Sequence, residues 1–409
     1  MAEVVVMVTT SYPRFPGDSA GTFMEPIARA VAARGHEVHV VAPWHPLVAR
    51  PSIHDGVHLH FYSYSPLRSL NVFGYAAAMH ADVRLRPAAY VAAPLALAAG
   101  WYAARSVARR RRATVMHGHW VIPGGATAAA AAPDLPLVIS LHGSDVHVAE
   151  TVAPARLAAR RAFRRAGYVT ACSDDLVRRA IALGAAPDRI ETVPYGVDVQ
   201  RFRPDQRART ALRQQLAVGE RTFLVVAAGR LVRKKGFEYL IDAVSRLPNA
   251  VLALAGDGTL AGELRERARA AGAGGRVRFL GNVAQSTVAD LLAAADAVCV
   301  PSVRDDSGNV DGLPNVLLEA LASGVPVLTT PAGGILSVVE NGVTAFVVPE
   351  RDAGALAAAI EHVTAEPGQA RQVGAAARAL VERRFGWGQA AERFETAYGA
   401  ALAFKSVGR

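Results

Sequence analysis

Two carboxylates, Asp311 and Glu319, lie eight positions apart across the expected start of a helix. Pro314 suits the first turn of that helix, where a missing N–H group costs nothing, and Gly324 is a typical stop. The N–H groups at a helix start favour an anion, commonly a phosphate. The segment could therefore bind a phosphate and offer a carboxylate on each side to accept hydrogen bonds from hydroxyl groups. A sugar nucleotide requires contacts of this kind, although an acidic loop before a helix can also lack any ligand.

A basic loop from Gly229 to Gly236 supplies the opposite charge. The chain has three lysines, Lys234, Lys235 and Lys405, among 45 lysines and arginines, so two of the three occur together in this loop. Lysine in a chain that otherwise uses arginine indicates that a compact ammonium group is needed there. Arg230 and Lys235 could together clamp a diphosphate and neutralise its charge. An ordinary basic surface turn is the alternative.

Histidines and a glycine-rich turn are the candidate groups of the first half. His117, His119 and His142 end or follow expected strands, so we expect them at one edge of a sheet. The usual role of such a histidine is a structural hydrogen bond. His142 is the strongest functional candidate, because Gly143 leaves space beside it. Gly21, between the first strand and the first helix, would let a ligand approach backbone amides.

No metal site is expected from the sequence. The stretch His117-Gly118-His119 has no further ligand nearby in the chain. The pairs Asp174-Asp175 and Asp305-Asp306 are adjacent residues, which point in different directions on a regular backbone and match no ligand spacing.

Short apolar strands alternate with helices in both halves of the chain, which predicts an α/β fold with doubly wound parallel sheets. At 409 residues the chain is too long for one ordinary core. We expect two such domains facing each other, with the ends of their strands in one cleft. The expected parts are a domain over 1–198, a polar linker over 199–221, a second domain over 222–383 and a final helix over 384–409.

The composition bears on the ligands of the protein, its cell compartment and its contact with membranes. The formal net charge is +10, yet basic and aromatic residues do not interleave, so we expect no nucleic-acid ligand. The chain has two cysteines far apart in sequence, Cys172 and Cys299, and its opening strand lacks the features of a secretory signal. Both observations fit the reducing cytoplasm. The uncharged stretch 87–104 is expected to be a helix on a sheet or at a membrane surface rather than a span. The basic, apolar region from Leu67 to Arg112 suggests peripheral contact with an anionic membrane at its inner face.

The order of the motifs resembles family 4 of the retaining glycosyltransferases. The GT-B fold of that family has two Rossmann-like domains and a last helix that crosses back to the first domain. The resemblance spans nearly the whole chain. It is carried by Gly21, Gly35-His36-Glu37-Val38, His119, His142-Gly-Ser-Asp145, Pro194-Tyr-Gly196-Val-Asp198, Phe202-Arg-Pro204, Gly229-Arg230, Lys235-Gly236, Ala255-Gly256-Asp-Gly258, Gly281-Asn-Val283, Pro301-Ser302, the stretch 311–326 and Phe385-Gly-Trp387.

The resemblance implies a role for each matching residue. Asp311 would contact the hydroxyls of the donor sugar, and Glu319 would bind the nucleotide ribose. Asp311 is shorter than the family's more usual glutamate. Tyr195 stands where the family usually has asparagine, which we interpret as a structural variation. The other implied contacts are Arg230 and Lys235 at the diphosphate, backbone groups of Leu313, Pro314, Asn315 and Val316, Val283 beside the base, His142 close to the donor sugar, and Gly21 near the phosphate or the acceptor.

The implied reaction moves a hexose from UDP-hexose or GDP-hexose to a hydroxyl of a saccharide or lipid-linked saccharide, with retention of the anomeric configuration and without a metal or cofactor. Synthesis of a cell-surface polysaccharide or glycolipid is the expected setting. Within the same fold, the alternatives are a nucleotide-sugar epimerase, a phosphorylase, and a binding module without activity. None of the three lysines suggests a phosphorylase cofactor site. The basic loop and the second acid argue against a degenerate module.

Overall fold

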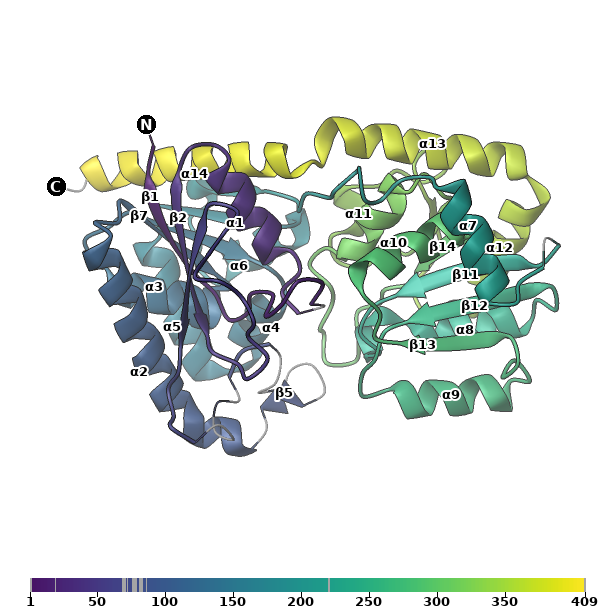
Figure 1. The fold of residues 1–409 in the computed structure, drawn as a ribbon, viewed down its shortest axis with the longest axis horizontal. Helices are drawn as coiled ribbons and strands as arrows, with labels where there is room; N and C mark the ends of the chain where they lie inside the picture. The colour runs from purple at the N-terminus through teal and green to yellow at the C-terminus, as the bar shows by residue number, and fades with distance from the viewer. Residues whose placement is uncertain are drawn as a thin grey trace. The chain divides into compact units, whose positions relative to one another are not determined.

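The computed structural model describes residues 2–407 except residues 19, 68–70, 72, 76–78, 81–83, 86 and 220. The chain divides into two compact units (Figure 1). Met1–Tyr195 and Trp387–Arg409 form the first unit, and Gly196–Gly386 form the second. Each unit contains one main sheet with helices packed against it.

The sheet of the first unit has eight strands in the order β10-β9-β8-β7-β1-β2-β4-β3. Paired strands are parallel except that β3 is antiparallel to β4. Central strands such as β1 are apolar on both faces, which is typical of a parallel sheet covered on both sides. The strands are β1 (Val4–Val8), β2 (Glu37–Pro43), β3 (Ile53–His54), β4 (Val57–Tyr62), β7 (Val115–His119), β8 (Leu137–Leu141), β9 (Tyr168–Ala171) and β10 (Ile190–Thr192), with a separate pair of β5 (Met79–His80) and β6 (Arg84–Leu85).

Helices cover both faces of this sheet. Helices α1 and α14 pack together over one face, where Val5 and Met7 of β1 join their core. Helix α2 contacts β1, β2 and β4, and α3 contacts α2 and β7. The helices are α1 (Met24–Ala32), α2 (Pro87–Arg110), α3 (Ala126–Ala131), α4 (Ser144–Thr151), α5 (Ala153–Arg165), α6 (Asp174–Ala182) and α14 (Trp387–Val407).

The last helix returns to the first unit, as the sequence predicted. Phe394 and Tyr398 of α14 are buried in the core that α1 and β1 share, and Trp387 packs against that core. The aromatic spacing of the C-terminal segment therefore serves the first unit's core.

The sheet of the second unit has the order β13-β12-β11-β14-β15-β16, and its paired strands are parallel. This is the Rossmann strand order, in which the chain winds outward in both directions from the first strand and the fourth. The strands are β11 (Phe223–Ala228), β12 (Ala250–Ala255), β13 (Val277–Gly281), β14 (Ala297–Val300), β15 (Val327–Thr329) and β16 (Phe346–Val347).

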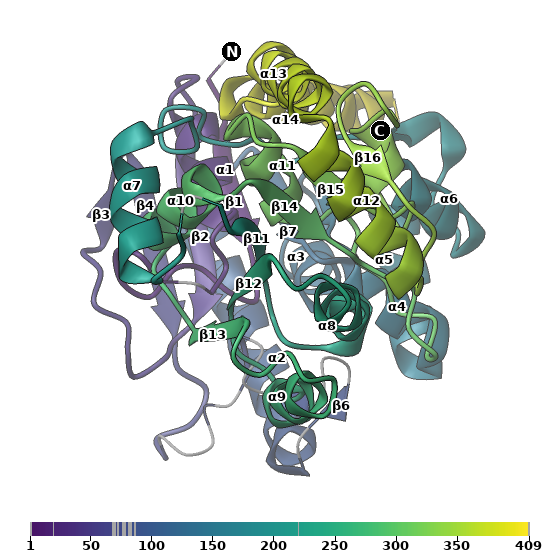
Figure 2. The same cartoon turned by 90° about the vertical axis from the view of Figure 1, so that its right-hand side faces the viewer.

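The second sheet is also covered on both faces (Figure 2). Helices α8, α9 and α12 share one core with β11 and β12. Helices α10 and α11 contact β11, β14 and β15, while α7 packs on α10 and α13 on α11. The helices are α7 (Gln206–Gln215), α8 (Phe237–Ser245), α9 (Ala261–Ala270), α10 (Gln285–Ala294), α11 (Asn315–Ala322), α12 (Ala353–Ala365) and α13 (Pro367–Arg384).

The expected linker differs from the structure. Residues 206–215 form α7, and the second unit begins at Gly196 rather than at residue 222. The arginines that made this segment look like a polar linker are engaged in contacts. Arg213 Nη1 lies 2.9 Å from Oδ2 of Asp296, Arg209 also pairs with Asp296, and Leu212 is buried.

The region considered for membrane contact is partly described. The stretch 87–104 lies within α2, on the sheet, as expected. None of the helices in the described ranges combines the length and the apolar composition needed to cross a bilayer. Several residues of the Leu67–Arg112 region, among them 68–70, 76–78 and 81–83, lie outside the described residues.

Candidate functional site

The loops that follow β11 and β14 meet at the carboxyl edge of the second unit's sheet. The two strands are parallel neighbours from which the chain winds in opposite directions, and open α/β sheets bind ligands at such a switch point. The first loop carries Arg230, Lys234 and Lys235, and the second leads to Asp311. The N–H of Val303 in the second loop donates to the carbonyl oxygen of Lys234 at 2.9 Å. The two loops are therefore in direct contact.

Asp311 is paired with both lysines of the first loop. The Nζ of Lys235 lies 2.6 Å from Oδ2 of Asp311, and the Nζ of Lys234 lies 3.3 Å from Oδ1. Burial alone would raise the pKa of Asp311, but the positive charges of the two lysines and Arg230 outweigh it and hold the pKa well below its usual range. The carboxylate therefore stays ionised at neutral pH.

Two glycines allow the loop after β11 to lie close to its neighbours, the loops after β14 and β12. Gly236 has a φ of +63°, in the left-handed region, and a Cβ there would lie 2.0 Å from the carbonyl oxygen of Pro301. A Cβ on Gly256, after β12, would lie 1.9 Å from the carbonyl oxygen of Gly229. Any other residue at either position would push the loops apart.

Glu319 lies one turn inside α11 and is largely enclosed. Burial raises its pKa to about 7, although a hydrogen bond from Gln285 and the charges of Arg201 and Lys235 act in the opposite direction. The Nε2 of Gln285 donates to Oε1 of Glu319 at 3.4 Å. Near pH 7 the two protonation states of Glu319 are thus close in free energy.

The start of α11 differs slightly from the expectation. Pro314, expected in the first turn, is the N-cap residue with ψ at 120°, and the helix begins at Asn315. A proline ring fixes φ but not ψ, so it suits either position. Pro314 makes no side-chain hydrogen bond to this helix start, so the N–H groups of Asn315 and Val316 are suited to an anion. Leu313 is buried just before this turn.

Val283, predicted beside a base, follows β13 and is half-buried. It lies two residues after Gly281, whose carbonyl oxygen accepts the N–H of Gly256 at 2.7 Å. The structure thus places Val283 on the same carboxyl edge as the basic loop.

His142 lies in a group of aromatic rings in the first unit. Its Nδ1 is 2.7 Å from Oη of Tyr195, and its Nε2 is 3.2 Å from Nδ1 of His119. Phe23 packs against His142 and Tyr195 at ring-centroid distances of 4.8 and 4.9 Å. Burial lowers the pKa of His142 to about 3 and that of His119 well below its ordinary value, so both rings are neutral at pH 7.

His117 has a structural role instead. Its Nε2 lies 2.7 Å from the hydroxyl of Ser140, and its Nδ1 lies 2.8 Å from the hydroxyl of Tyr398 on α14. His119 ends β7 and His142 follows β8, as expected, whereas His117 lies inside β7 rather than after it. Its ring points into the core and packs against His119 at a ring-centroid distance of 4.1 Å, and His119 in turn contacts His142.

Asp145 fixes the turn that carries His142. This buried carboxylate accepts the N–H of Gly143 at 2.9 Å, of Val121 at 2.7 Å and of His142 at 3.3 Å. Burial raises the pKa of Asp145 in spite of these hydrogen bonds, which favour the ionised form.

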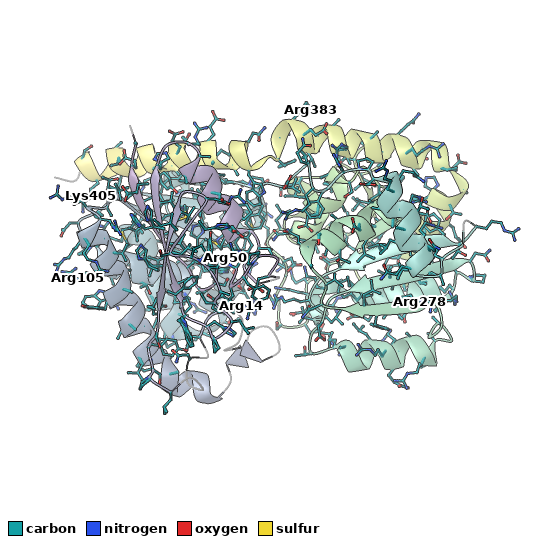
Figure 3. The ribbon with its side chains drawn as sticks, viewed as in Figure 1. Arg14, Arg50, Arg105, Arg278, Arg383 and Lys405 are labelled. Atoms are coloured by element: carbon teal, nitrogen blue, oxygen red, sulfur yellow. The ribbon has the colours of Figure 1, made fainter. Side chains whose placement is uncertain are left out.

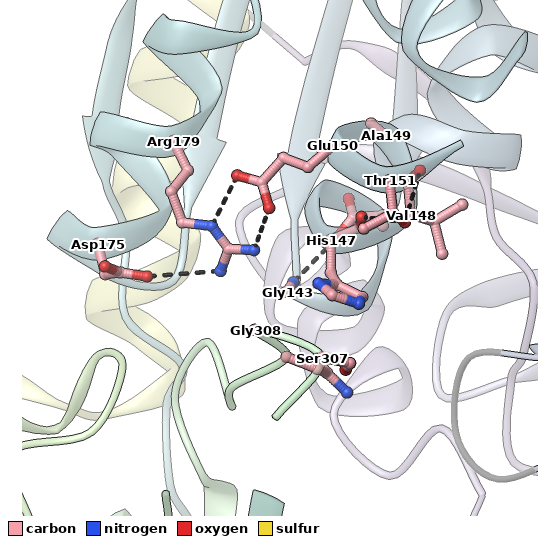
Figure 4. A network of polar contacts seen from close by, with 12 residues as sticks. Gly143, His147, Val148, Ala149, Glu150, Thr151, Asp175, Arg179, Ser307 and Gly308 are labelled. Atoms are coloured by element: carbon pink, nitrogen blue, oxygen red, sulfur yellow. Dashed lines mark hydrogen bonds and ion pairs between the residues drawn. The ribbon is translucent and has the colours of Figure 1, made fainter. Parts of the chain in front are cut away.

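An ion-pair network holds the helix that follows this turn (Figure 4). Arg179 of α6 donates from Nε and Nη2 to the two carboxylate oxygens of Glu150 on α4, at 2.9 and 2.6 Å. Its Nη1 also lies 3.5 Å from Oδ2 of Asp175. The position of α4, and with it the turn at His142, is therefore tied to α6.

Gly21 lies in the turn before α1 with a φ of +66°, and a Cβ there would be 3.0 Å from Oγ of Ser11. The same turn holds a paired carboxylate, because Arg14 donates to Asp18 from Nε at 2.7 Å and from Nη2 at 2.8 Å. The turn is ordered by these contacts, and the role of Gly21 near a ligand stays a prediction.

Comparison with known proteins shows the family to which this chain belongs. A model of the Glycosyl transferases group 1 matches residues 208–380, and a model of Glycosyltransferase Family 4 matches residues 20–201. A Catenulispora acidiphila protein named D-inositol 3-phosphate glycosyltransferase 1 is 32% identical over 313 residues, which are 70% of this chain and 72% of that protein. The chain belongs to glycosyltransferase family 4, within the glycosyl transferases group 1.

Other similarities agree with this family. A GDP-mannose-dependent alpha-(1-6)-phosphatidylinositol monomannoside mannosyltransferase of Mycobacterium tuberculosis is 36% identical over 51% of this chain, and the match spans only 55% of that relative's length. Anabaena HepE, solved in complex with UDP, is 22% identical with a TM-score of 0.76, over 96% of this chain and 98% of its own. The GT-B fold predicted from the sequence is therefore confirmed.

The structure brings most of the predicted donor residues of this family 4 chain together in its second unit. Arg230, Lys235, Asp311 and Glu319 all lie around the switch point, whereas His142 and Gly21 belong to the first unit. Within the described part of the chain no three histidine, cysteine, aspartate or glutamate side chains are placed to hold a metal.

Three residues that contact predicted site residues of this family 4 chain were not identified from the sequence. Lys234 was assigned no role, yet it is buried against Asp311. Gln285 was not noticed, because a polar residue at a helix start is unremarkable in sequence. Tyr195 was interpreted as a structural variation, yet it is the partner of His142. The departure from the family's asparagine was the signal that could have identified it.

Positive charge of this family 4 chain is also spread over its surface. Arg278 and Arg383 are exposed in the second unit, and Arg105 and Lys405 lie on helices of the first (Figure 3). This distribution fits a solvated basic surface. The lysine pair at the switch point differs from it, because Lys234 is buried and Lys235 is partly buried.

Proposed function

We propose that the chain is a retaining glycosyltransferase that moves a hexose from a nucleoside-diphosphate donor to a hydroxyl of a saccharide or lipid-linked saccharide. The observation that carries this proposal is the contact of Lys234 and Lys235 with Asp311 at the switch point of a family 4 chain. This contact places two ammonium groups at the carboxyl edge of the sheet, in the same loop as Arg230. A diphosphate is the ligand that such a group of cations would bind.

The barrier of such a transfer lies in separating the diphosphate from an oxocarbenium-like sugar. Arg230, Lys235 and the start of α11 would stabilise the charge that develops on the departing phosphate. Lys235 is the more exposed of the two lysines, so it would leave Asp311 for the phosphate while Lys234 keeps Asp311 in place. The leaving phosphate would help to deprotonate the acceptor on the same face.

The remaining residues would orient the donor. Asp311 would accept hydrogen bonds from the sugar hydroxyls, and Glu319 from the ribose. The backbone from Leu313 to Val316 would contact the phosphate, and Val283 would line the base. His142 is neutral at pH 7, so it would act near the sugar through hydrogen bonds and not as a charged acid.

The names of relatives support two donors and a lipid-linked acceptor. The Mycobacterium tuberculosis relative is named as GDP-mannose-dependent and as acting on a phosphatidylinositol monomannoside, and HepE was solved with UDP. We therefore propose GDP-hexose or UDP-hexose as the donor and a glycolipid as the first acceptor to test.

Helix α2 supports peripheral contact with a membrane that holds such an acceptor. Leu95 is 53% exposed and Tyr102 is 69% exposed, on a helix that ends in arginines. Arg109 and Arg112 are also exposed. Exposed apolar residues next to arginines are suited to an anionic lipid surface.

Incubation with a panel of UDP- and GDP-hexoses, with and without glycolipid and saccharide acceptors, tests the proposal. Mass spectrometry should detect a hexosylated acceptor that forms with one donor and only when both substrates are present. A new sugar and free nucleotide without an acceptor would instead identify an epimerase. Binding of the donor without any product would identify a binding module.

A further inference from the structure

Arg201, Gln285 and Glu319 form a chain of hydrogen bonds inside the second unit. The Nη1 of Arg201 donates to Oε1 of Gln285, and the Nε2 of Gln285 donates to Oε1 of Glu319 at 3.4 Å. A guanidinium has no acceptor atom, so the amide oxygen of Gln285 must face Arg201 and its NH₂ group must face Glu319. The chemistry of both partners therefore fixes the orientation of the amide.

The backbone around Arg201 is held in place. Oδ1 of Asp198 accepts the N–H groups of Gln200 at 3.0 Å and of Arg201 at 3.1 Å. On the other side, Nη1 of Arg378 donates to the carbonyl oxygen of Phe202 at 3.1 Å. Arg201 thus extends from an ordered turn, and Gln285 extends from the first position of α10.

We infer that Arg201 and Gln285 are positioning residues that keep Glu319 ionised and oriented to accept the ribose hydroxyls of a nucleotide. This inference rests on the proposed function, because it takes the ligand of Glu319 to be the ribose. A carboxylate accepts two hydroxyl hydrogens, whereas a protonated carboxyl must donate one of its own. Gln285 contacts Oε1, which leaves Oε2 to accept a hydrogen bond from a ligand.

The charges around Glu319 show why its contact with Gln285 and, through it, Arg201 matters for ionisation. We call these two residues the Arg201–Gln285 relay. Burial favours the neutral carboxyl, and the cations whose fields oppose this are Arg201, before α7, and Lys235, after β11. Arg378, on α13, is paired with Glu382 at 2.7 Å and also donates to Ala322 at the other end of α11. Gln285 is the group that links the exposed charge of Arg201 to the enclosed carboxylate.

Binding of a nucleotide should therefore be linked to loss of a proton. Ribose hydroxyls stabilise the carboxylate, so a nucleotide should lower the pKa of Glu319 from about 7. Affinity should be constant above that pH and should fall below it. Without the relay the same decline should begin at a higher pH.

Titration of the Glu319 carboxyl by ¹³C NMR tests the relay without any ligand, with Glu319→Gln identifying the signal. We expect a midpoint near 7 in the unmodified protein and a midpoint at least about half a unit higher in Gln285→Leu and Arg201→Met. Arg201→Lys should restore most of the shift, because it keeps a charged donor. Arg207→Met, at an exposed arginine of the neighbouring helix α7, is the matched control and should change nothing. Equal midpoints in all variants would overturn the inference.

Calorimetry with GDP and UDP at pH 6, 7 and 8.5 then tests the link to binding. Gln285→Leu should weaken binding by about 3- to 10-fold at pH 7, the range expected for the loss of one ordinary hydrogen bond, and by less at pH 8.5. A shifted midpoint with an unchanged affinity profile would overturn the positioning role. If the unmodified protein binds neither nucleotide, the proposed function fails, while the NMR titration still decides whether the relay ionises Glu319.

Discussion

The Nζ of Lys235 lies 2.6 Å from Oδ2 of Asp311 and joins the two loops on either side of the second sheet's switch point. Lys234 holds the other carboxylate oxygen at 3.3 Å. A single carboxylate between two ammonium groups orders both loops. It also holds both ammonium groups at the edge where the phosphate of a donor would bind.

Asp311→Asn should destabilise the protein by about 3 kcal/mol at pH 7, because it removes the buried carboxylate that pairs with both Lys234 and Lys235. Asp311→Glu restores the family's usual acid and should recover part of the loss. The pKa of Asp311 is lowered, so its stabilisation is present above the unfolded value of 3.8, declines below it and is lost as the pH falls through the lower folded value. Chemical denaturation at pH 7 measures the effect of the substitution, and the same measurement at pH 3.5 should show the start of the decline. Equal stability of Asp311→Asn and the unmodified protein at pH 7 would show that the ion pairs do not form.

Glu319→Gln should stabilise the protein at pH 8 in the absence of added nucleotide. The pKa of Glu319 is raised from 4.5 to about 7 on folding, so stability falls as the pH rises between these values. The glutamine variant avoids this loss, and we expect a gain of about 1–3 kcal/mol at pH 8 and almost none at pH 5. Thermal melts at both pH values test the difference. A gain of the same size at both would contradict the burial of an ionised Glu319.

Gly236→Ala should disrupt the basic loop. The added Cβ would lie 2.0 Å from the carbonyl oxygen of Pro301, and the φ of +63° adds strain. We expect a loss of more than about 2 kcal/mol together with weaker nucleotide binding. Gly262→Ala on α9 is the matched control, since no described atom lies within 4 Å of its Cβ, and it should gain about 0.5–1 kcal/mol. Similar denaturation curves for the two variants would argue against the tight contact between the loops.

The exposed side chains of α2 should contribute to membrane binding. Leu95→Ser combined with Tyr102→Ser should weaken binding to vesicles of anionic phospholipid by about tenfold. Leu157→Ser on α5 removes another exposed apolar residue and should have no effect. Binding should also weaken from 50 to 500 mM salt, because the arginines of α2 act through screened charge. Co-sedimentation with vesicles measures binding of both variants and its dependence on salt. An absence of binding by the unmodified protein at low salt would rule out membrane contact through this helix.

Strand–helix alternation was sufficient to predict the fold, because buried parallel strands are short apolar runs bounded by polar residues, proline or glycine. The apolar runs 137–141, 250–255 and 297–300, for example, each form a strand. The segment 199–221 was misjudged because its arginines look solvated in sequence, whereas Arg209 and Arg213 pair with Asp296 about 85 residues later. Sequence spacing cannot show partners that are so far apart.

The candidate site was predictable in its acids and its basic loop, whose residue types and spacing are local. The ion pairs within the site were not predictable, because a contact such as that of Lys234 with Asp311 depends on how two loops meet at a sheet edge. The same holds for Tyr195 and His142, which are 53 positions apart. The raised pKa of Glu319 also depends on burial, which the sequence does not reveal.

The affinity of nucleoside diphosphates for the unmodified protein and for Lys235→Met, measured by calorimetry, tests the central claim most directly. We predict that GDP or UDP binds the unmodified protein, and that Lys235→Met weakens this binding by at least about tenfold, the loss expected for one charge-assisted contact, without unfolding the chain. Arg278→Met, at an exposed arginine of the same unit, should leave the affinity unchanged. An affinity that is equal in Lys235→Met and the unmodified protein would contradict the assignment of the switch-point cluster to a diphosphate.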